Sequence, residues 1–340
     1  MRLNWFSTFT RKTFPSFSYF VFSIFLLGNS DSLNALNGET TKGKHIELGD
    51  VEWYRNFDQA KKISSQSGKP LFVLFQEVPG CLGCQQYGKE VLSHSLIVEA
   101  IEELFIPVAV FNNREGEDRK VLDQYKEPSW NFQVVRYLDK DGKDIIPRED
   151  QIWTVAETAK RMVSVLKAYH RPVPKYLSTL AIHEVDDNLK TAAFAMYCFW
   201  EGEAKLGSLQ GVVSTESGWM EGREVVKLRY DPEQINWDTL VASAEQFKCA
   251  NKIYSPDANT KKEAEKISHH PTALYSDKKY RPAKEPDQKF MIKRTALKQL
   301  DLSETQAVKV NAALKYNDLN TALEYLSPRQ IEQLKAFEKK

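Results

Sequence analysis

The chain has 340 residues, of which 42% are hydrophobic and 27% are charged, so it can bury the cores of two or three domains. Its 18 Phe, 14 Tyr and 7 Trp exclude an intrinsically disordered chain, and its four Cys exclude a small disulfide-rich protein. The 47 Lys and Arg nearly balance the 46 Asp and Glu, so no overall field attracts nucleic acid. Function must therefore reside in a local site.

Residues 1–32 are typical of a secretory signal peptide. Arg2, Arg11 and Lys12 precede an apolar run at 17–27, which is shorter than the roughly 20 residues that span a bilayer. We therefore expect a periplasmic or extracellular protein, with an uncleaved membrane anchor as the alternative. An exported chain meets an oxidising environment, in which thiol chemistry needs a dedicated reductant.

The next part of the chain predicts an α/β domain at 49–172, preceded by a polar linker at 33–48. Continuous apolar runs indicate buried strands, and apolar residues at 3.6-residue spacing indicate amphipathic helices. The expected strands lie at 71–75, 108–111 and 134–138, and the expected helices lie at 56–66, 96–105 and 155–166.

A second linker at 173–190 leads to a second predicted domain at 191–282. Its order of strand, helix, strand, strand and helix suits a ferredoxin-like α+β sandwich. Residues 255–290 read as irregular, and 283–340 as a helical C-terminal region. The expected elements are a strand at 192–197, a helix at 198–209, strands at 211–215 and 225–230, a helix at 238–250, and C-terminal helices that begin near Ser303 and Pro328.

A C-x-x-C motif, Cys81 and Cys84, follows a buried strand and the turn 78–80. We expect Cys81 at a helix N-terminus, where free N–H groups stabilise a thiolate. The spacing lets the two sulfurs cycle between dithiol and disulfide. The alternatives are an inert pair and a metal site for copper(I) or zinc, although zinc needs a second ligand pair that the adjacent His269 and His270 do not supply.

Residues 50–170 resemble the thioredoxin superfamily, and Val78-Pro79-Gly80-Cys81 resembles the VPGU-type thioredoxin-like (seleno)protein family. The resemblance implies that Cys81 is the nucleophile and Cys84 the resolving thiol. Thioredoxins place a proline directly before the strand that faces the C-x-x-C. Here Pro128 lies six residues before the strand, so we expect either Pro128 or Trp130 to border the motif.

A second candidate site begins at Cys198, which follows an expected strand and opens an expected helix. That position also stabilises a thiolate. Phe199 and Trp200 come next, and two aromatic rings beside a sulfur can hold a methyl or thioether group. The alternative is a buried cysteine among ordinary core aromatics.

Several spaced segments follow one another in this part of the chain. In chain order they are Cys198-Phe199-Trp200-Glu201-Gly202-Glu203-Ala204, Gly211-Val212-Val213-Ser214-Thr215, Gly218-Trp219, Glu224-Val225-Val226 and Tyr230-Asp231-Pro232. With these segments, residues 190–250 resemble peptide methionine sulfoxide reductase A. The resemblance implies that Cys198 attacks the sulfoxide sulfur and that Glu224 protonates the sulfoxide oxygen, because a carboxyl group in a dry aromatic pocket can act as an acid.

The same resemblance implies the substrate-binding residues, with Phe199 and Trp200 around the methyl group. Trp219 stands where the family has a hydrogen-bonding tyrosine, and Tyr280 resembles a later tyrosine that contributes a phenol. Cys249 is a candidate resolving thiol for Cys198, with ordinary packing as the alternative. Three departures weaken the match: Tyr197 and Glu201 replace glycines, and Arg223 directly precedes Glu224 and favours its ionised form.

These features predict an exported thiol-dependent oxidoreductase of the peptide-methionine (S)-S-oxide reductase type, in which the Cys81/Cys84 dithiol recharges Cys198. We expect no cofactor, no metal and no nucleic acid. The expected partners are proteins or peptides with oxidised methionine or disulfides, and an upstream thiol reductant. The alternatives are a thiol–disulfide oxidoreductase whose second domain only binds clients, and a copper(I)-handling envelope protein.

Overall fold

The computed structural model describes residues 40–41, 45–130, 133–182 and 188–338. The predicted signal peptide and most of the predicted linker at 33–48 lie outside these residues. Among the described helices, none combines the length and the apolar character that crossing a bilayer requires.

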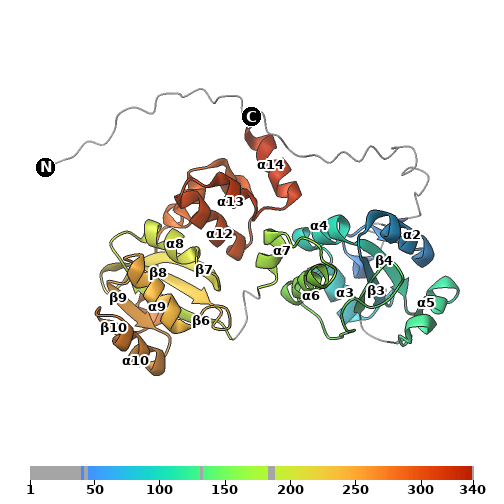
Figure 1. Ribbon diagram of the computed structural model, residues 1–340, viewed down its shortest axis with the longest axis horizontal. Helices are drawn as coiled ribbons and strands as arrows, with labels where there is room; N and C mark the ends of the chain where they lie inside the picture. The colour runs from blue at the N-terminus through green and yellow to red at the C-terminus, as the bar shows by residue number, and fades with distance from the viewer. Residues whose placement is uncertain (1–39, 42–44, 131–132, 183–187, 339–340) are drawn as a thin grey trace. The chain divides into compact units, whose positions relative to one another are not determined.

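The first domain is built on a five-stranded sheet with the order β1-β2-β4-β3-β5 (Figure 1). The central strands β3 and β4 are parallel, and β5 pairs with β3 in antiparallel register. The elements are β1 (Thr40–Thr41), η2 (Ile46–Leu48), β2 (Trp53–Tyr54), α2 (Phe57–Ser67), β3 (Leu71–Gln76), α3 (Leu82–Glu90), α4 (Ser95–Leu104), β4 (Ile106–Phe111), α5 (Glu117–Tyr125), β5 (Val134–Leu138), α6 (Val155–Ala168) and α7 (Lys175–Leu180).

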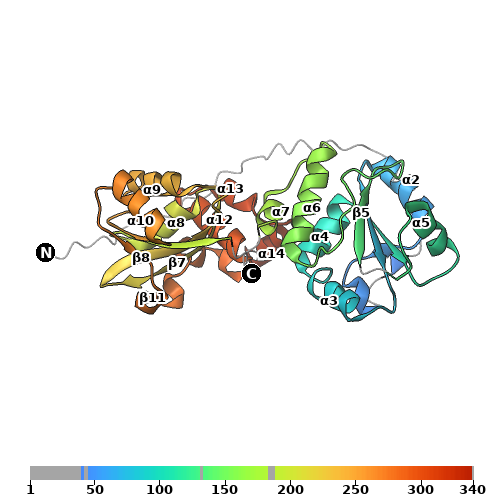
Figure 2. The ribbon, with the colours of Figure 1, turned by 90° about the horizontal axis from the view of Figure 1, so that it is seen from below.

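Helices cover both faces of this sheet, which explains why every residue of β3 and β4 is buried. Alternate residues of β3 point to opposite faces. Leu71, Val73 and Phe75 pack with residues of α2 and α5, whereas Phe72 and Leu74 pack with residues of α4 and α6. Figure 2 shows these two pairs of helices on opposite sides of the sheet. The predicted strands and helices of this domain are confirmed, with ends shifted by one or two residues.

Both predicted linkers contribute residues to this first core. Leu48 of η2 is 2% exposed, and Tyr176, Leu177 and Leu180 of α7 are buried in the same cluster. The apolar residues of α7 recur at helical spacing, which is the signal for a packed amphipathic helix. The packed region therefore extends beyond the predicted limits 49–172 on both sides.

The second domain is built on a six-stranded sheet with the order β10-β9-β6-β8-β7-β11. Its four central strands, β9-β6-β8-β7, are antiparallel and have the strand order of a ferredoxin-like sandwich, as predicted. Helices α8, α9 and α10 lie on one face (Figure 2). The elements are β6 (Lys190–Ala195), α8 (Phe199–Gly207), β7 (Val212–Met220), β8 (Arg223–Tyr230), α9 (Trp237–Gln246), β9 (Lys252–Ser255), α10 (Ala258–Ile267), β10 (Thr272–Leu274), η3 (Asp277–Lys279) and β11 (Tyr280–Pro282).

The prediction of an irregular segment at 255–290 is wrong. This segment contains α10 and the edge strands β10 and β11. Helix α10 begins with a capping box between Asp257 and Thr260 and buries only Ala264, so it has almost no apolar stripe. The short edge strands β10 and β11 form because they pair with β9 and β7, and not because of a pattern in their own residues.

The C-terminal region is helical, as predicted. Ser303 caps α12 by accepting a hydrogen bond from the backbone N–H of Gln306, and Pro328 occupies the first position of α14. Helix α12 packs against α8 and β7. The elements are η4 (Glu285–Asp287), α11 (Phe290–Lys293), η5 (Ala296–Gln299), α12 (Glu304–Lys315), α13 (Leu319–Leu323) and α14 (Pro328–Glu338).

Candidate functional site

Cys81 and Cys84 lie at the start of α3, as the motif predicts. Cys81 is the N-cap residue and is exposed, whereas Cys84 is fully buried, and their Sγ atoms are 3.6 Å apart. Burial raises the pKa of Cys84 to about 12, because the thiolate would lose its hydration. One accessible sulfur beside one buried, protonated sulfur is the arrangement that a nucleophile and a resolving thiol require.

Two polar side chains hold the turn that precedes Cys81. The backbone N–H of Gly80 donates to Oε1 of Glu47 at 2.8 Å, and Asn113 bonds the backbone of Val78 and Pro79 at 3.1 Å each. A Cβ at Gly80 would lie 2.3 Å from the carbonyl oxygen of Glu77, so only glycine fits there. Glu47 was not predicted, because a single acidic residue in a polar segment gives no pattern.

Trp153, which the sequence did not single out, borders the motif. A Cβ added to Gly83 would lie 3.4 Å from the ring of Trp153 and 3.9 Å from Sγ of Cys81. Trp130 is 77% exposed. The segment before α6 therefore borders the dithiol, a placement that sequence spacing did not indicate.

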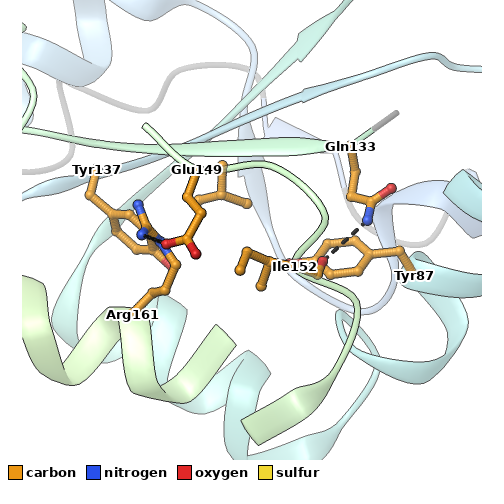
Figure 3. A pocket seen from close by; sticks show the side chains of 7 residues that line it. Tyr87, Gln133, Tyr137, Glu149, Ile152 and Arg161 are labelled. Carbon is orange, nitrogen blue, oxygen red and sulfur yellow. Dashed lines mark hydrogen bonds and ion pairs between the residues drawn. The ribbon is translucent and has the colours of Figure 1, made fainter. Parts of the chain in front are cut away.

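A small cavity lies beside α3 (Figure 3). It holds about 10 Å³ of space, room for about one water molecule. Nε2 of Gln133 donates to the carbonyl of Ile152, while Oε1 of Gln133 is buried without a described partner. No cysteine lines this cavity, so it takes no part in the thiol site. Its lining residues are Tyr87, Gln133, Val135, Tyr137, Glu149, Ile152 and Arg161.

Cys198 and Glu224 meet at the N-terminus of α8. Cys198 is the half-buried N-cap residue, and its side chain makes no capping hydrogen bond. Instead, Oε2 of Glu224 accepts a hydrogen bond from the backbone N–H of Phe199 at 2.8 Å. The thiol and the carboxyl group therefore share one helix terminus, whose free N–H groups attract negative charge.

Three of the four predicted substrate-binding residues gather beside this terminus. Trp219 of β7 pairs in register with Glu224 of β8, so their side chains lie on the same face of the sheet. The ring of Phe199 lies 5.6 Å from that of Trp219 and 5.9 Å from that of Trp200, centroid to centroid. The indole nitrogen of Trp200 is buried without a described acceptor.

Tyr280 lies on the other face of the sheet. It pairs with Met220, one residue along β7 from Trp219, and packs into a separate cluster around Ala193, Val225 and Tyr254. Its hydroxyl donates to the carbonyl oxygens of β7. The structure thus does not bring Tyr280 to the Cys198 site, because strand alternation points it away.

Helix α8 packs closely against Met196, the residue that follows β6. A Cβ at Gly202 would lie 1.6 Å from Sδ of Met196, so the Met196 side chain would have to move to admit a side chain there. Nearby, Tyr197 is 93% exposed, Arg223 is exposed, and Glu201 pairs with Lys205 at 2.8 Å. In the described part of the chain, no ion pair joins Arg223 to Glu224.

Cys249 follows α9 and is 3% exposed. Burial raises its pKa to about 11. The four cysteines are all free thiols. Within the described residues, no group of three or more His, Cys, Asp or Glu side chains has a metal-binding arrangement.

Two kinds of known protein are similar to parts of this chain. A thioredoxin-like family model matches residues 52–141. Peptide methionine sulfoxide reductase MsrA of Methanococcus maripaludis (strain C7) is 37% identical over 71 residues, which cover 16% of this chain and 45% of the relative. The chain thus spans about half the length of that curated relative.

Two solved structures also match parts of the chain. Methionine sulfoxide reductase A of Corynebacterium diphtheriae is 20% identical, with a TM-score of 0.29 over 36% of this chain and 82% of that one. The DsbH oxidoreductase is 19% identical, with a TM-score of 0.29 over 41% of this chain and 98% of that one. The order of elements makes the fold mixed α/β with a helical C-terminal region, and the family model identifies a thioredoxin-like domain in its first part.

Proposed function

We propose that this chain is a thiol-dependent peptide-methionine (S)-S-oxide reductase of the MsrA type, with a fused dithiol as its reductant. The observation that carries the proposal is the meeting of the Cys198 thiol, the Glu224 carboxyl group and the rings of Phe199 and Trp219 at one helix N-terminus. The sequence similarity of the chain to peptide methionine sulfoxide reductases supports it.

The chemistry needs a nucleophile and an acid. The Cys198 thiolate attacks the electrophilic sulfur of methionine sulfoxide and forms an S–S bond, and the S–O bond breaks as the oxygen takes two protons and leaves as water. We assign one of these protons to the Glu224 carboxyl group and the other to solvent. A water molecule then attacks the Cys198 sulfur and loses a proton, the S–S bond breaks, and methionine leaves with the bonding electron pair. The products are methionine and a sulfenic acid on Cys198, so the substrate sulfur gains two electrons and the cysteine sulfur loses two.

Phe199, Trp200 and Trp219 supply the apolar surface for the methyl group. A sulfoxide joins one polar oxygen to one apolar methyl group, so a carboxyl group beside aromatic rings matches both ends of it. In the (R)-sulfoxide the oxygen and the methyl group occupy each other's positions relative to the (S)-sulfoxide. The site should therefore distinguish the two epimers.

The sulfenic acid must then be reduced. A second thiol condenses with it, releases water and forms a disulfide, and the Cys81/Cys84 dithiol reduces that disulfide by exchange. An upstream thiol donor reduces Cys81 and Cys84 again. The second thiol is Cys249 or one of the fused pair, and fusion raises the effective concentration of the dithiol without a tight interface.

We also propose export, because an apolar run lies near the N-terminus. The segment Val78-Pro79-Gly80-Cys81 is the reason why we assign the first domain to the VPGU-type family.

The experiment is turnover of N-acetyl-methionine (S)-sulfoxide amide with dithiothreitol. We expect Cys198→Ser to abolish activity, and Glu224→Gln to lower kcat by about 10²–10⁴-fold, the usual contribution of a general acid. Glu233→Gln, at an exposed carboxyl group of the same domain, is the matched control. Equal activity in wild type and Cys198→Ser, or preference for the (R)-epimer, would reject the proposal.

A second candidate is thiol–disulfide exchange on protein clients, favoured by the exposed Cys81 beside the buried Cys84. It predicts reduction of insulin disulfides that requires Cys81 and is unaffected by Glu224→Gln. Copper(I) retention by Cys81 and Cys84 without redox turnover would instead support the metal-handling alternative.

A further inference from the structure

An aromatic residue of the C-terminal region covers the predicted methyl-binding tryptophan. Phe290, at the start of α11, stacks on Trp200 with ring centroids 4.2 Å apart and planes 10° from parallel. This is closer and flatter than the contact of Trp200 with Phe199, at 5.9 Å and 49°. Phe290 therefore holds one face of the Trp200 indole in van der Waals contact.

A buried ion pair fixes the place of Phe290. Glu203, on α8, is fully buried. One of its oxygens accepts from Nζ of Lys289 at 2.8 Å, and the other accepts from the backbone N–H of Lys289 at 2.8 Å. Lys289 has φ 47°, a left-handed conformation that is uncommon for a residue with a side chain. The residue before Phe290 is thus tied to α8 through both its backbone and its side chain.

The C-terminal region also binds the other end of the same helix. Nζ of Lys309, on α12, donates to the carbonyl oxygens of Gly207 and Leu209 at 2.9 and 2.7 Å. These carbonyls lie at and just beyond the C-terminus of α8, where a cation offsets the negative end of the helix dipole. The helix that presents Cys198 and Trp200 is therefore held at three points by residues 289–309.

We propose that Phe290 is a positioning residue of the sulfoxide site, acting through Trp200. The geometry assigns residues 289–309 to the reductase site itself. Phe290 sets the orientation of the Trp200 indole, and that orientation shapes the pocket for the substrate methyl group. This inference rests on the proposed function, because it assigns a role to Trp200 in binding a methyl sulfoxide.

The physical reason is the freedom of a half-buried tryptophan. Trp200 lies in the first turn of α8 and is only partly buried, so its side chain has several rotamers open to it without a neighbour on the outer face. A flat ring at 4.2 Å excludes most of them. A preorganised pocket binds its ligand more tightly than one that must order on binding.

The test compares Phe290→Ala, Phe290→Leu and Phe290→Tyr in the full chain. With N-acetyl-methionine (S)-sulfoxide amide, we expect Phe290→Ala to raise KM about tenfold, a factor that corresponds to about 1.4 kcal/mol, with kcat within about twofold of wild type. Phe290→Tyr keeps a flat ring and should retain the wild-type KM. Phe290→Leu keeps apolar volume without a flat ring and should raise KM about threefold.

Tyr316→Ala is the matched control, since Tyr316 is an aromatic residue of the same region and is 60% exposed. It should leave KM unchanged. A wild-type KM in both Phe290→Ala and Phe290→Leu would overturn the proposal. If Phe290→Ala fails to fold, the contrast between Phe290→Leu and Phe290→Tyr decides.

A second readout needs no turnover. N-acetyl-methionine amide should protect Cys198 of the wild type from alkylation by iodoacetamide, and Phe290→Ala should need about ten times more ligand for the same protection. If the wild type turns over no sulfoxide, the proposed function fails, and protection that Phe290→Ala weakens would still support the pocket. Absence of protection in the wild type would overturn the role of Phe290 as well.

Discussion

Burial decides how the cysteine side chains can react. Cys81 is exposed, whereas Cys84 and Cys249 are buried and have pKa values raised to about 12 and about 11. Only the thiolate attacks an electrophile, so a raised pKa makes a thiol slow at neutral pH. Cys81 can therefore attack first, and Cys84 and Cys249 can act only as second thiols.

We expect iodoacetamide at pH 7 to label Cys81 at least 100-fold faster than Cys249. Labelling of Cys249 should rise about tenfold per pH unit, up to a pH near 11. Mass spectrometry of tryptic peptides measures both rates. In urea all four cysteines should react at similar rates, which is the control. Equal labelling of Cys81 and Cys249 in the folded chain at pH 7 would contradict this prediction.

Gly202 packs against the side chain of Met196, which follows β6. The Cβ of Gly202→Ala would lie 1.6 Å from Sδ of Met196, so the Met196 side chain must leave its place in the core. We expect a loss of about 1–3 kcal/mol in the free energy of unfolding and a lower kcat. The control on the same helix is Gly207→Ala, whose Cβ would lie 2.9 Å from a methyl group of Val308 and should cost less. Urea denaturation measures both, and equal losses would contradict the contact argument.

The helix α8 carries the site, and a lysine from α12 caps it. Burial lowers the pKa of Lys309 to about 8. An unfolded lysine keeps its proton up to a pKa near 10.5. Between these values the unfolded chain binds more protons than the folded chain, so the free energy of unfolding rises with pH.

Lys309→Met should remove this pH dependence. In the wild type, we expect the contribution of Lys309 to increase by about 2 kcal/mol between pH 7 and pH 9.5. The difference between wild type and Lys309→Met in urea denaturation at the two pH values measures it. Lys298→Met, at an exposed lysine of the same region, is the control. Parallel pH profiles for wild type and Lys309→Met would show that the lysine is not buried as described.

Among the elements, those with strong local signals were predicted correctly. The apolar run of β3 and the capping boxes at Thr154 and Ser303 coincide with the observed elements. Helix α10 and strands β10 and β11 were missed, because α10 buries a single alanine and the edge strands depend on pairing with β9 and β7. The local sequence pattern thus predicts the helices and strands that bury an apolar face of their own. It does not predict elements that are stabilised mainly by contacts with neighbouring strands.

The whole chain combines two thiol centres, and its covalent linkage makes a kinetic prediction. With a limiting upstream thiol reductant, turnover that uses Cys81 to recharge Cys198 should be first order in wild-type chain, because the transfer is intramolecular. A mixture of Cys81→Ser chains and Cys198→Ser chains must transfer electrons between molecules. Its specific activity should rise with protein concentration and stay below that of the wild type.

Steady-state kinetics over a hundredfold range of concentration measures this. Each variant alone should be inactive under these conditions, which is the control. Full activity of Cys81→Ser alone would show that the first domain does not supply the electrons.

Sequence spacing located both thiol centres, because each cysteine opens a helix after a strand and both motifs are contiguous in the chain. The resemblance to peptide methionine sulfoxide reductase A singled out Glu224 and Trp219, which the structure pairs across β8 and β7. The sequence did not predict contacts between segments that lie far apart in the chain. These are the contact of Glu47 with the turn before Cys81, and the contacts of Lys289 and Phe290 with α8. Tyr280 resembled a family tyrosine, yet its register on β11 turns it to the opposite face. The periodicity of the sequence indicates which face of its own helix or strand a residue occupies. Only the packing of the elements in the tertiary structure determines which distant residue lies opposite it.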